Sequence, residues 1–314
     1  MAVYTHVSAH DIVGFLANYD LGVYEGHRGI TQGVENTNYH LQTDRGRYIL
    51  TIFEKRVRRE DLPFIYGFTN HLRHAGITVP DTYADRVGRT VGTLAGKPAS
   101  IIRFLDGAGV PDADVTPSHC TQVGTTLAQM HKAASTYKQH RENPVGFAQW
   151  QKLLSDALPR TDLLSADDIA AIDSALEEYE GLDLHNLPHG AIHADAFPDN
   201  VFFRDGTLRG VIDFYFACTD TFVYDTALTI NAWCFDTKGQ IQPDRLAAFI
   251  GAYQQVRPLS DDEREVFPAL RRAAALRILS TRLYDWEFTP KDADVVKKDP
   301  REYVAKLKSD ITWP

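Results

Sequence analysis

The sequence His-Ala-Asp-Ala-Phe-Pro-Asp-Asn at residues 193–200, followed closely by Ile-Asp-Phe at residues 212–214, carries most of the information in this chain. Phosphoryl transfer needs a carboxylate to accept the proton of the attacking hydroxyl, and oxygen ligands that hold Mg²⁺ against the phosphates. Asp195 suits the first role. Asn200 and Asp213 suit the second, because Mg²⁺ prefers hard oxygen ligands and takes few of them from protein. The pattern predicts an ATP- and Mg²⁺-dependent phosphotransferase centre.

The residues between these two motifs predict a β-hairpin. Asp205 and Gly206 lie between two short apolar stretches, and an Asp-Gly pair in that setting is a strong signal for a two-residue turn. With this pair as the turn, Asn200 is expected opposite Val211, and Asp213 diagonally beyond it. The hairpin would then place both metal ligands at one rim.

Two histidines near the expected catalytic carboxylate allow a different interpretation. His189, His193 and Asp195 all carry side chains that can bind zinc. Pro188 and Gly190 disfavour a helix here, so the four-residue spacing would not place both histidines on one helical face. We therefore assign His193 to the catalytic centre with Asp195, as a residue that fixes the loop through hydrogen bonds.

The chain resembles the aminoglycoside phosphotransferase and choline kinase superfamily, whose fold is similar to that of protein kinases. Within it, the sequence is most similar to the bacterial homoserine kinases. The segments that carry this closer resemblance are Tyr4-Thr5, Glu35 to Tyr39, Leu50 to Glu54 and residues 193–200. The resemblance implies an α+β fold of two lobes: an N-terminal nucleotide-binding lobe, residues 1–105, with a mixed or antiparallel sheet and a long helix, and a mainly helical catalytic and substrate-binding lobe, residues 106–314.

The resemblance also implies a reaction. The γ-phosphoryl group of ATP would pass, with Mg²⁺, to the hydroxyl of L-homoserine, giving O-phospho-L-homoserine for threonine biosynthesis. Two alternatives stay open at this stage. One is a kinase of the same fold acting on another small alcohol, such as choline, an aminoglycoside, hydroxylysine or methylthioribose. The other is a nucleotide-binding protein without catalytic activity.

The sequence departs from the kinase pattern at one position. Kinase-like folds usually place a Lys on the third strand, where it holds the nucleotide phosphates. The corresponding residue here is Thr51. The missing charge could come from Lys55, Arg56, Arg58 or Arg59, or backbone amides and metal could replace it. Solvated basic residues at the start of a helix explain the same cluster equally well.

The candidate nucleotide contacts all lie in the expected N-terminal lobe. They are Gly33, Asn36, Asn38, Thr51, Arg103, Phe104 and Leu105. Residues 33–38 form a small polar loop whose backbone amides could contact phosphates, although a plain β-turn uses the same residue types. By resemblance, residues 103–105 begin the hinge that hydrogen-bonds adenine, and an ordinary connecting loop is the alternative.

Composition excludes several other classes of protein. The chain has 314 residues with 44% hydrophobic and 24% charged content, which is ordinary for a globular protein. A formal net charge of -9 argues against binding to nucleic acid or anionic membranes. The three cysteines have no metal or redox spacing, which is typical of reduced cytosolic proteins. No secretory signal and no apolar run of about 20 residues is evident, so we expect a cytoplasmic protein.

Capping and periodicity predict most of the remaining elements. Capping residues predict helices that begin after Ser8, Thr116, Ser165 and Ser260. A further helix is expected over residues 60–74. Strands are expected at residues 29–33, 38–43, 47–53, 82–86, 90–94 and 100–104. His131, on an apolar helix face, is expected to be a buried core residue. The resemblance to the kinase superfamily implies that Asp225 braces the metal-binding loop rather than binding metal.

Overall fold

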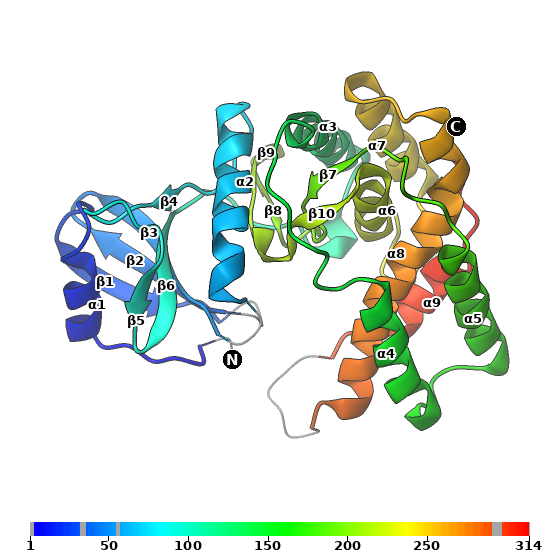
Figure 1. Ribbon diagram of the computed structural model, residues 1–314, viewed down its shortest axis with the longest axis horizontal. Helices are drawn as coiled ribbons and strands as arrows, with labels where there is room; N and C mark the ends of the chain where they lie inside the picture. Colours follow the sequence, from blue (N-terminus) through cyan, green and yellow to red (C-terminus); the bar gives the residue numbers. More distant parts are fainter. Residues whose placement is uncertain (1–2, 32–35, 55–56, 291–296, 314) are drawn as a thin grey trace. The chain divides into compact units, whose positions relative to one another are not determined.

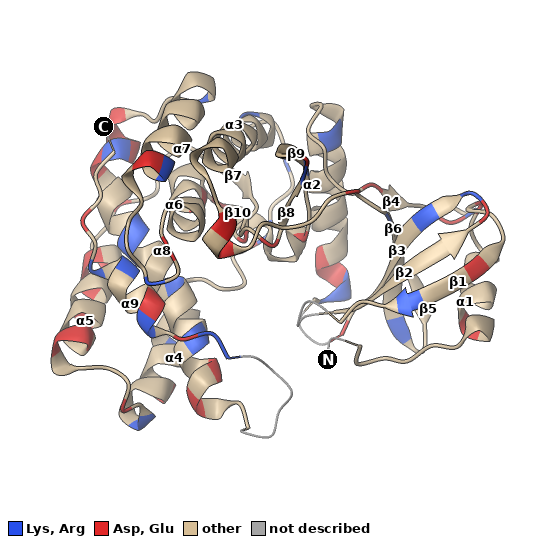
Figure 2. Ribbon diagram, turned by 180° about the vertical axis from the view of Figure 1, so that it is seen from behind, with Lys and Arg blue, Asp and Glu red and all other residues tan. Residues whose placement is uncertain are grey.

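The computed structural model describes residues 3–31, 36–54, 57–290 and 297–313 (Figure 1). The chain divides into two compact units, Met1–Asp106 and Gly107–Pro314. Acidic and basic residues are interspersed in both units (Figure 2). None of the helices in the described residues combines the length and apolar character needed to cross a membrane.

The first unit is built on an antiparallel sheet. Its strands are β1 (Tyr24–Gly29), β2 (Thr37–Thr43), β3 (Gly46–Ile52), β4 (Thr82–Tyr83), β5 (Gly92–Leu94) and β6 (Lys97–Arg103). Their order is β1-β2-β3-β6-β4, and β5 also pairs with β6. Side chains alternate between the two faces of a strand, so Leu41, Leu50 and Ile101 lie on one face and form a core with helix α1 (Ala9–Leu16).

Local signals for the first unit are largely confirmed. Helix α1 begins with the predicted capping box of Ser8 and Asp11. The helix expected at 60–74 is a 3₁₀ turn (Arg59–Asp61) followed by α2 (Leu62–His74). The strand expected at residues 29–33 was wrong, because β1 ends at Gly29. Its sequence Tyr-Glu-Gly-His-Arg-Gly is too polar to show the apolar alternation that marks a strand.

The second unit is mainly helical. Its helices are α3 (Pro117–Ala134), α4 (Phe147–Ala157), α5 (Ala166–Glu180), α6 (Phe222–Trp233), α7 (Pro243–Val256), α8 (Asp261–Phe288) and α9 (Arg301–Leu307). The predicted capping residues Thr116, Ser165 and Ser260 start α3, α5 and α8. Helix α8 packs against α4, α5, α6 and α9, and most of its middle portion is buried. Helix α8 therefore forms the centre of the hydrophobic core of this unit.

Two small antiparallel sheets lie in the second unit. β7 (His189–Ile192) pairs with β10 (Cys218–Thr221), and β8 (Val201–Arg204) pairs with β9 (Thr207–Val211). The segment at residues 193–200 connects β7 to β8, and residues 212–214 follow β9 directly. The two motifs that the sequence singles out are therefore both held at strand ends.

Candidate active site

The β8–β9 hairpin positions the second motif beside the first. Asp205 and Gly206 have φ values of 52° and 72°, as the predicted Asp-Gly turn requires. The register differs from the prediction, because a β-bulge shifts the pairing and places Val201, not Asn200, opposite Val211. The backbone carbonyl of Asn200 instead accepts a hydrogen bond from the N–H of Ile212 at 2.8 Å. The bulge thus brings Asn200 beside the residue that precedes Asp213.

His193 is fixed by hydrogen bonds at both ring nitrogens. Its Nε2 donates to the carbonyl of Ile212 at 2.9 Å, and its Nδ1 accepts from the N–H of Asp195 at 3.1 Å. The ring is fully buried and lies 4.5 Å from the ring of Phe214. Burial lowers the pKa of His193, and these two bonds require the neutral ring. The side chain therefore ties the first motif to the second, which is the loop-fixing role expected of it.

The zinc interpretation of the same histidines finds no support in the geometry. His189 begins strand β7, and its Nδ1 lies 3.1 Å from the carbonyl of Leu187. Over the part of the chain that the structure describes, no group of three or more His, Cys, Asp or Glu side chains could hold a metal ion. A site with fewer protein ligands, of the kind that Mg²⁺ uses, is compatible with this result.

Asp195 is held by the asparagine that follows it in the loop. The Nδ2 of Asn200 donates to the Asp195 carbonyl at 2.9 Å and to its carboxylate Oδ2 at 3.0 Å. The other carboxylate oxygen, Oδ1, lies 3.5 Å from Nη1 of Arg277, and the Asp195 side chain keeps 20% of its exposure. Burial raises the pKa of Asp195, and the charge of Arg277 opposes that rise. The arrangement leaves a carboxylate that is oriented, partly accessible and more basic than usual.

Two residues of the site have left-handed backbone conformations. The φ of Ala194 is 61° and that of Asp213 is 64°, values that are uncommon outside glycine. Such a conformation costs of order 1–3 kcal/mol and persists only where the surroundings hold it. At Ala194 the conformation is held by Asp225, because the backbone N–H groups of Ala194 and His193 both donate to its carboxylate, at 2.8 and 3.0 Å. Asp225 thus braces the catalytic loop directly, through the backbone of His193 and Ala194.

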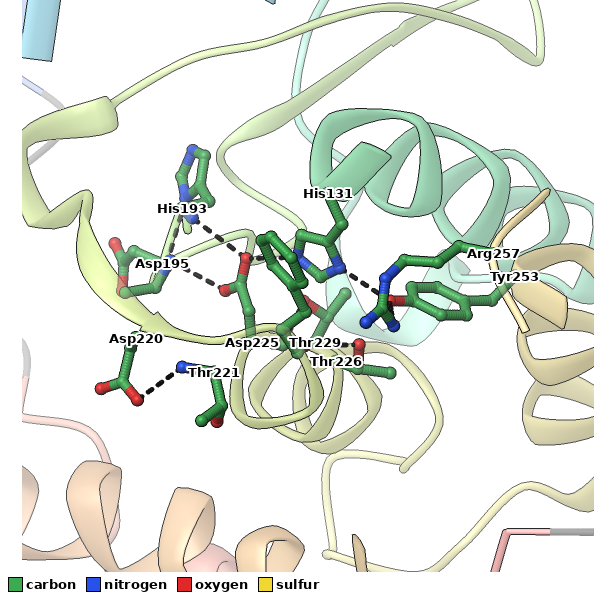
Figure 3. Close-up of polar contacts among 12 residues, drawn as sticks. His131, His193, Asp195, Asp220, Thr221, Asp225, Thr226, Thr229, Tyr253 and Arg257 are labelled. Atoms are coloured by element: carbon green, nitrogen blue, oxygen red, sulfur yellow. Dashed lines mark hydrogen bonds and ion pairs between the residues drawn. The ribbon is translucent and has the colours of Figure 1, made fainter. Parts of the chain in front are cut away.

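Asp225 is the centre of a buried network (Figure 3). Nε2 of His131 lies 3.0 Å from its carboxylate, and Nδ1 of His131 lies 2.7 Å from the hydroxyl of Tyr253. Arg257 donates to that hydroxyl at 3.1 Å. Burial raises the pKa of Asp225, but the hydrogen bonds that it accepts from His131 and from the backbone of His193 oppose this, and the pKa is lowered overall. His131 is therefore a satisfied core residue, as predicted, and a support of the catalytic loop.

Acidification should weaken the fold through the two buried histidines. Burial lowers the pKa of both His131 and His193, so the folded protein keeps these rings neutral while the unfolded chain binds protons below about pH 6.5. Unfolding then takes up protons, and the free energy of unfolding decreases as pH falls, by up to about 1.4 kcal/mol per pH unit for each ring. Denaturant unfolding between pH 7.5 and 5 should show this slope. His193→Gln should reduce it, and a slope that this variant leaves unchanged would contradict the assignment.

Two further contacts at the site were not predicted from the sequence. Arg277, on α8, is 6% exposed and pairs with Asp195. Trp233, on α6, donates from Nε1 to the carbonyl of Ala196 in the catalytic loop, at 2.7 Å. The Arg277 contact had a signal in the sequence, because a charged residue inside the run Ala-Ala-Ala-Leu-Arg-Ile-Leu needs a partner when that run is buried.

The predicted nucleotide contacts are distributed over the sheet of the first unit. Asn38 and Thr51 are paired across β2 and β3, and Oγ1 of Thr51 donates to Oδ1 of Asn38 at 2.7 Å. Oδ1 of Asn36 accepts from the N–H of Glu54 at 3.3 Å. Phe104 lies under the guanidinium of Arg47, at 4.2 Å from the ring centre. Arg103 ends β6 and Leu105 follows it half-buried, whereas Gly33 lies outside the described residues.

Only part of the basic cluster near Thr51 lies in the described residues. Arg58 is engaged with Asp61 at 3.0 Å at the start of α2, and Lys55 and Arg56 lie outside the described residues. A Lys–Glu ion pair does exist in this unit, between Lys97 and Glu54. Oε1 of Glu54 also accepts a hydrogen bond from Oγ1 of Thr37. Thr37 and Asn38 are neighbours on β2, so their side chains point to opposite faces of the sheet. The Glu54 contact is therefore on the face opposite to Asn38 and Thr51.

Known proteins resemble this chain over almost its full length. The profile of the phosphotransferase enzyme family matches residues 26–259. The homoserine kinase of Afipia carboxidovorans is 46% identical over 98% of this chain and 94% of its own length. The homoserine kinase of Rhodospirillum rubrum is 46% identical over 98% of this chain and 95% of its own length. The chain belongs to the homoserine kinases of the phosphotransferase enzyme family. Membership of this family makes it an ATP-dependent kinase that acts on a small molecule.

Solved structures confirm the kinase-like fold predicted for this homoserine kinase family member. A microcompartment-associated aminopropanol kinase superposes with a TM-score of 0.71 at 18% identity, covering 96% of this chain and 95% of that one. Amicoumacin kinase hAmiN, in complex with AMP-PNP, Ca²⁺ and Ami, has a TM-score of 0.70 at 17% identity, covering 92% and 90%. At these identities the likeness concerns the fold alone.

Proposed function

We propose that this protein transfers the γ-phosphoryl group of ATP to the hydroxyl of L-homoserine, giving O-phospho-L-homoserine. The near-complete similarity to homoserine kinases supports the choice of acceptor. The single observation that supports the chemistry most strongly is the oriented carboxylate of Asp195, held by Asn200 at the point where the loop meets residues 212 and 213. A protein that only bound nucleotide would have no need of such a base.

Asp195 would act on the acceptor hydroxyl. Its carboxylate accepts a hydrogen bond from that hydroxyl, orients the oxygen toward the γ-phosphorus and takes the proton as the bond forms. The raised pKa of Asp195 makes it a better proton acceptor than an exposed carboxylate, and the partner bond from Asn200 fixes its direction. His193 contributes by holding the loop and has no nitrogen left over for proton transfer. Most of the rate then comes from positioning and charge stabilisation.

Asn200 and Asp213 would hold Mg²⁺. The hydrogen bonds that Nδ2 of Asn200 gives to Asp195 turn the amide nitrogen toward the base and the amide oxygen away from it. An amide oxygen and a carboxylate form the hard donor set that Mg²⁺ prefers, with its remaining positions left to phosphate and water. When bound, the ion neutralises charge on the phosphates. The residues present therefore fit the ion that the reaction needs.

The first unit would bind the nucleotide and the second would carry catalysis and the acceptor. We assign residues 1–105 and 106–314 to these roles, with Asn38, Thr51 and Phe104 among the nucleotide contacts. A net charge of -9 argues against binding to nucleic acid and supports a small-molecule acceptor. A biosynthetic kinase that draws on ATP would work in the cytoplasm.

Coupled ADP release from the purified protein tests this proposal. With Mg-ATP fixed, L-homoserine is compared with choline, L-serine, hydroxylysine, methylthioribose and kanamycin. We expect turnover with L-homoserine to exceed that with choline, methylthioribose and kanamycin by at least about 100-fold in kcat/KM, since a site built to pair charged groups rejects acceptors that leave them unpaired. L-serine and hydroxylysine keep both charged groups but place the hydroxyl at another distance, so they should be poorer acceptors by at least about 10-fold. Activity on another member of the panel, with none on L-homoserine, would keep the chemistry and refute the acceptor.

A further inference from the structure

Arg277 lies against the carboxylate of Asp195 without being bound tightly to it. Its Nη1 is 3.5 Å from Oδ1 of Asp195, which is long for a hydrogen bond between a guanidinium and a carboxylate. Its guanidinium also lies over the ring of Phe216, at 5.2 Å from the centre. The side chain is 7% exposed, so its charge is largely removed from water beside the expected reaction centre. Burying a charge is expensive unless it is well paired, so a loosely paired guanidinium at this place needs an explanation.

Other buried or half-buried arginines of the second unit show shorter contacts with their partners. Arg141, Arg257, Arg271 and Arg282 each have an oxygen partner at 2.6 or 2.7 Å. Those partners are backbone carbonyls or glutamates that belong to the supporting structure, and they fix the arginines in place. Arg277 differs from them, because its acidic partner is a residue of the reaction centre and the contact is longer.

The proposed acceptor has a group that a guanidinium binds well. L-homoserine carries a carboxylate four bonds from its hydroxyl oxygen, a span of up to about 5 Å. When the hydroxyl is hydrogen-bonded to Asp195, at about 2.7 Å, the carboxylate can reach Arg277, which is itself 3.5 Å from Asp195. The planar fork of Arg matches a carboxylate through two parallel hydrogen bonds. One pair of neighbouring residues can therefore hold both ends of the acceptor.

Rival cations near the catalytic loop are less suited to this task. A cavity of about 220 Å³ borders the loop at Phe197 to Asp199 and is lined by Arg282, Lys298 and Lys306 among others. Arg282 and Lys306 are both paired with Glu302 at 2.6 Å. That carboxylate offsets one of the two positive charges and holds both side chains in place, so neither cation is as free to turn to an acceptor as Arg277. Lys298 is exposed, and a carboxylate gains less from an exposed, hydrated ammonium than from a buried guanidinium.

We infer that Arg277 binds the carboxylate of the acceptor and so selects amino-acid alcohols over alcohols without that group. This inference rests on the proposed function. In the resting enzyme Arg277 holds Asp195 in place through the long contact. With acceptor bound, the guanidinium turns its remaining N–H groups to the carboxylate, and the hydroxyl at the other end of the molecule lies at Asp195.

Two acceptors that differ only in the carboxylate test the inference. 3-Aminopropan-1-ol is L-homoserine with hydrogen in place of that group. The values of kcat/KM for both are measured at saturating Mg-ATP in wild type, Arg277→Met and Arg277→Lys, with Lys298→Met as the control for loss of a nearby exposed cation. Calorimetric binding of L-homoserine in the presence of a non-hydrolysable ATP analogue decides the matter if the amino alcohol reacts too slowly. Thermal melting checks the fold of each variant.

The expected result is a loss that depends on the carboxylate. Arg277→Met should lower kcat/KM for L-homoserine by about 100-fold, mainly through KM, and that for 3-aminopropan-1-ol by less than about 5-fold. Arg277→Lys should recover part of the loss, and Lys298→Met should change neither acceptor by more than about 3-fold. Equal losses for both acceptors would overturn the inference and leave Arg277 as a positioning residue for Asp195 or the γ-phosphate. Selective loss in Lys298→Met would also overturn it. A wild type that phosphorylates other alcohols but not L-homoserine is a different result, which refutes the proposed function itself.

Discussion

Asp195→Asn should lower kcat by about 10³-fold or more while leaving nucleotide binding intact. The amide cannot accept the proton of the acceptor hydroxyl, yet it has the size and shape of the carboxylate it replaces. The fold should not suffer, because burial raises the pKa of Asp195 and the charged form is therefore the less favourable one in the folded state. At pH values above the ordinary pKa of an aspartate, burial of the charged carboxylate lowers the free energy of unfolding of wild type. The uncharged amide of the variant removes this destabilisation. Steady-state kinetics and thermal melting measure the two effects.

Asp205→Asn is a matched control for this variant. It makes the same chemical change in the same segment, but at an exposed turn position where the left-handed φ of 52° suits Asn as well as Asp. Its kcat should be within about 2-fold of wild type, as for most surface substitutions. Near-normal turnover in Asp195→Asn, or an equal loss in both variants, would remove Asp195 as the base.

Asp213→Asn should abolish most of the Mg²⁺-dependent gain in nucleotide affinity, weakening Mg-ATP binding by about 100-fold. Loss of a carboxylate ligand removes one negative charge from the expected ion site. Asn adopts the left-handed conformation of Asp213, with its φ of 64°, at least as readily as Asp does. The loop geometry is therefore expected to survive, and the effect should be electrostatic.

Titration of an ATP analogue with Mg²⁺ and with EDTA separates these contributions. In EDTA the variant and wild type should bind the nucleotide alike, or the variant slightly better, because a negative charge near the phosphates is gone. With saturating Mg²⁺ only wild type should gain affinity. Equal affinities of the two proteins at saturating Mg²⁺ would show that Asp213 is not a metal ligand.

Elements with local determinants were predictable from the sequence. The capping residues of α1, α3, α5 and α8 satisfy backbone groups within one turn, so their signal is complete in four consecutive residues. The Asp205-Gly206 turn is similar, since two positive φ values select those residue types. His131 followed from its place on an apolar helix face.

Features that depend on distant partners were not predictable in the same way. The bulge in β9 that moves Asn200 beside Ile212 adds one residue to a strand without changing its apolar pattern. The contact of Arg277 with Asp195 joins residues 82 positions apart (277 minus 195) and follows from the packing of α8. Strand β1 formed without an apolar pattern, because pairing with β2 supplies its hydrogen bonds. In each case tertiary structure decides what local sequence leaves open.

Identification of the phosphorylated product tests the central claim most directly. Wild type and Asp195→Asn are incubated with Mg-ATP and L-homoserine, and the reaction is followed by ³¹P NMR and mass spectrometry. We predict that wild type produces a phosphomonoester on the hydroxyl of L-homoserine in step with ADP, and that Asp195→Asn produces almost none. Release of inorganic phosphate alone, or phosphohomoserine formed equally by both proteins, would contradict Asp195-dependent transfer to this acceptor.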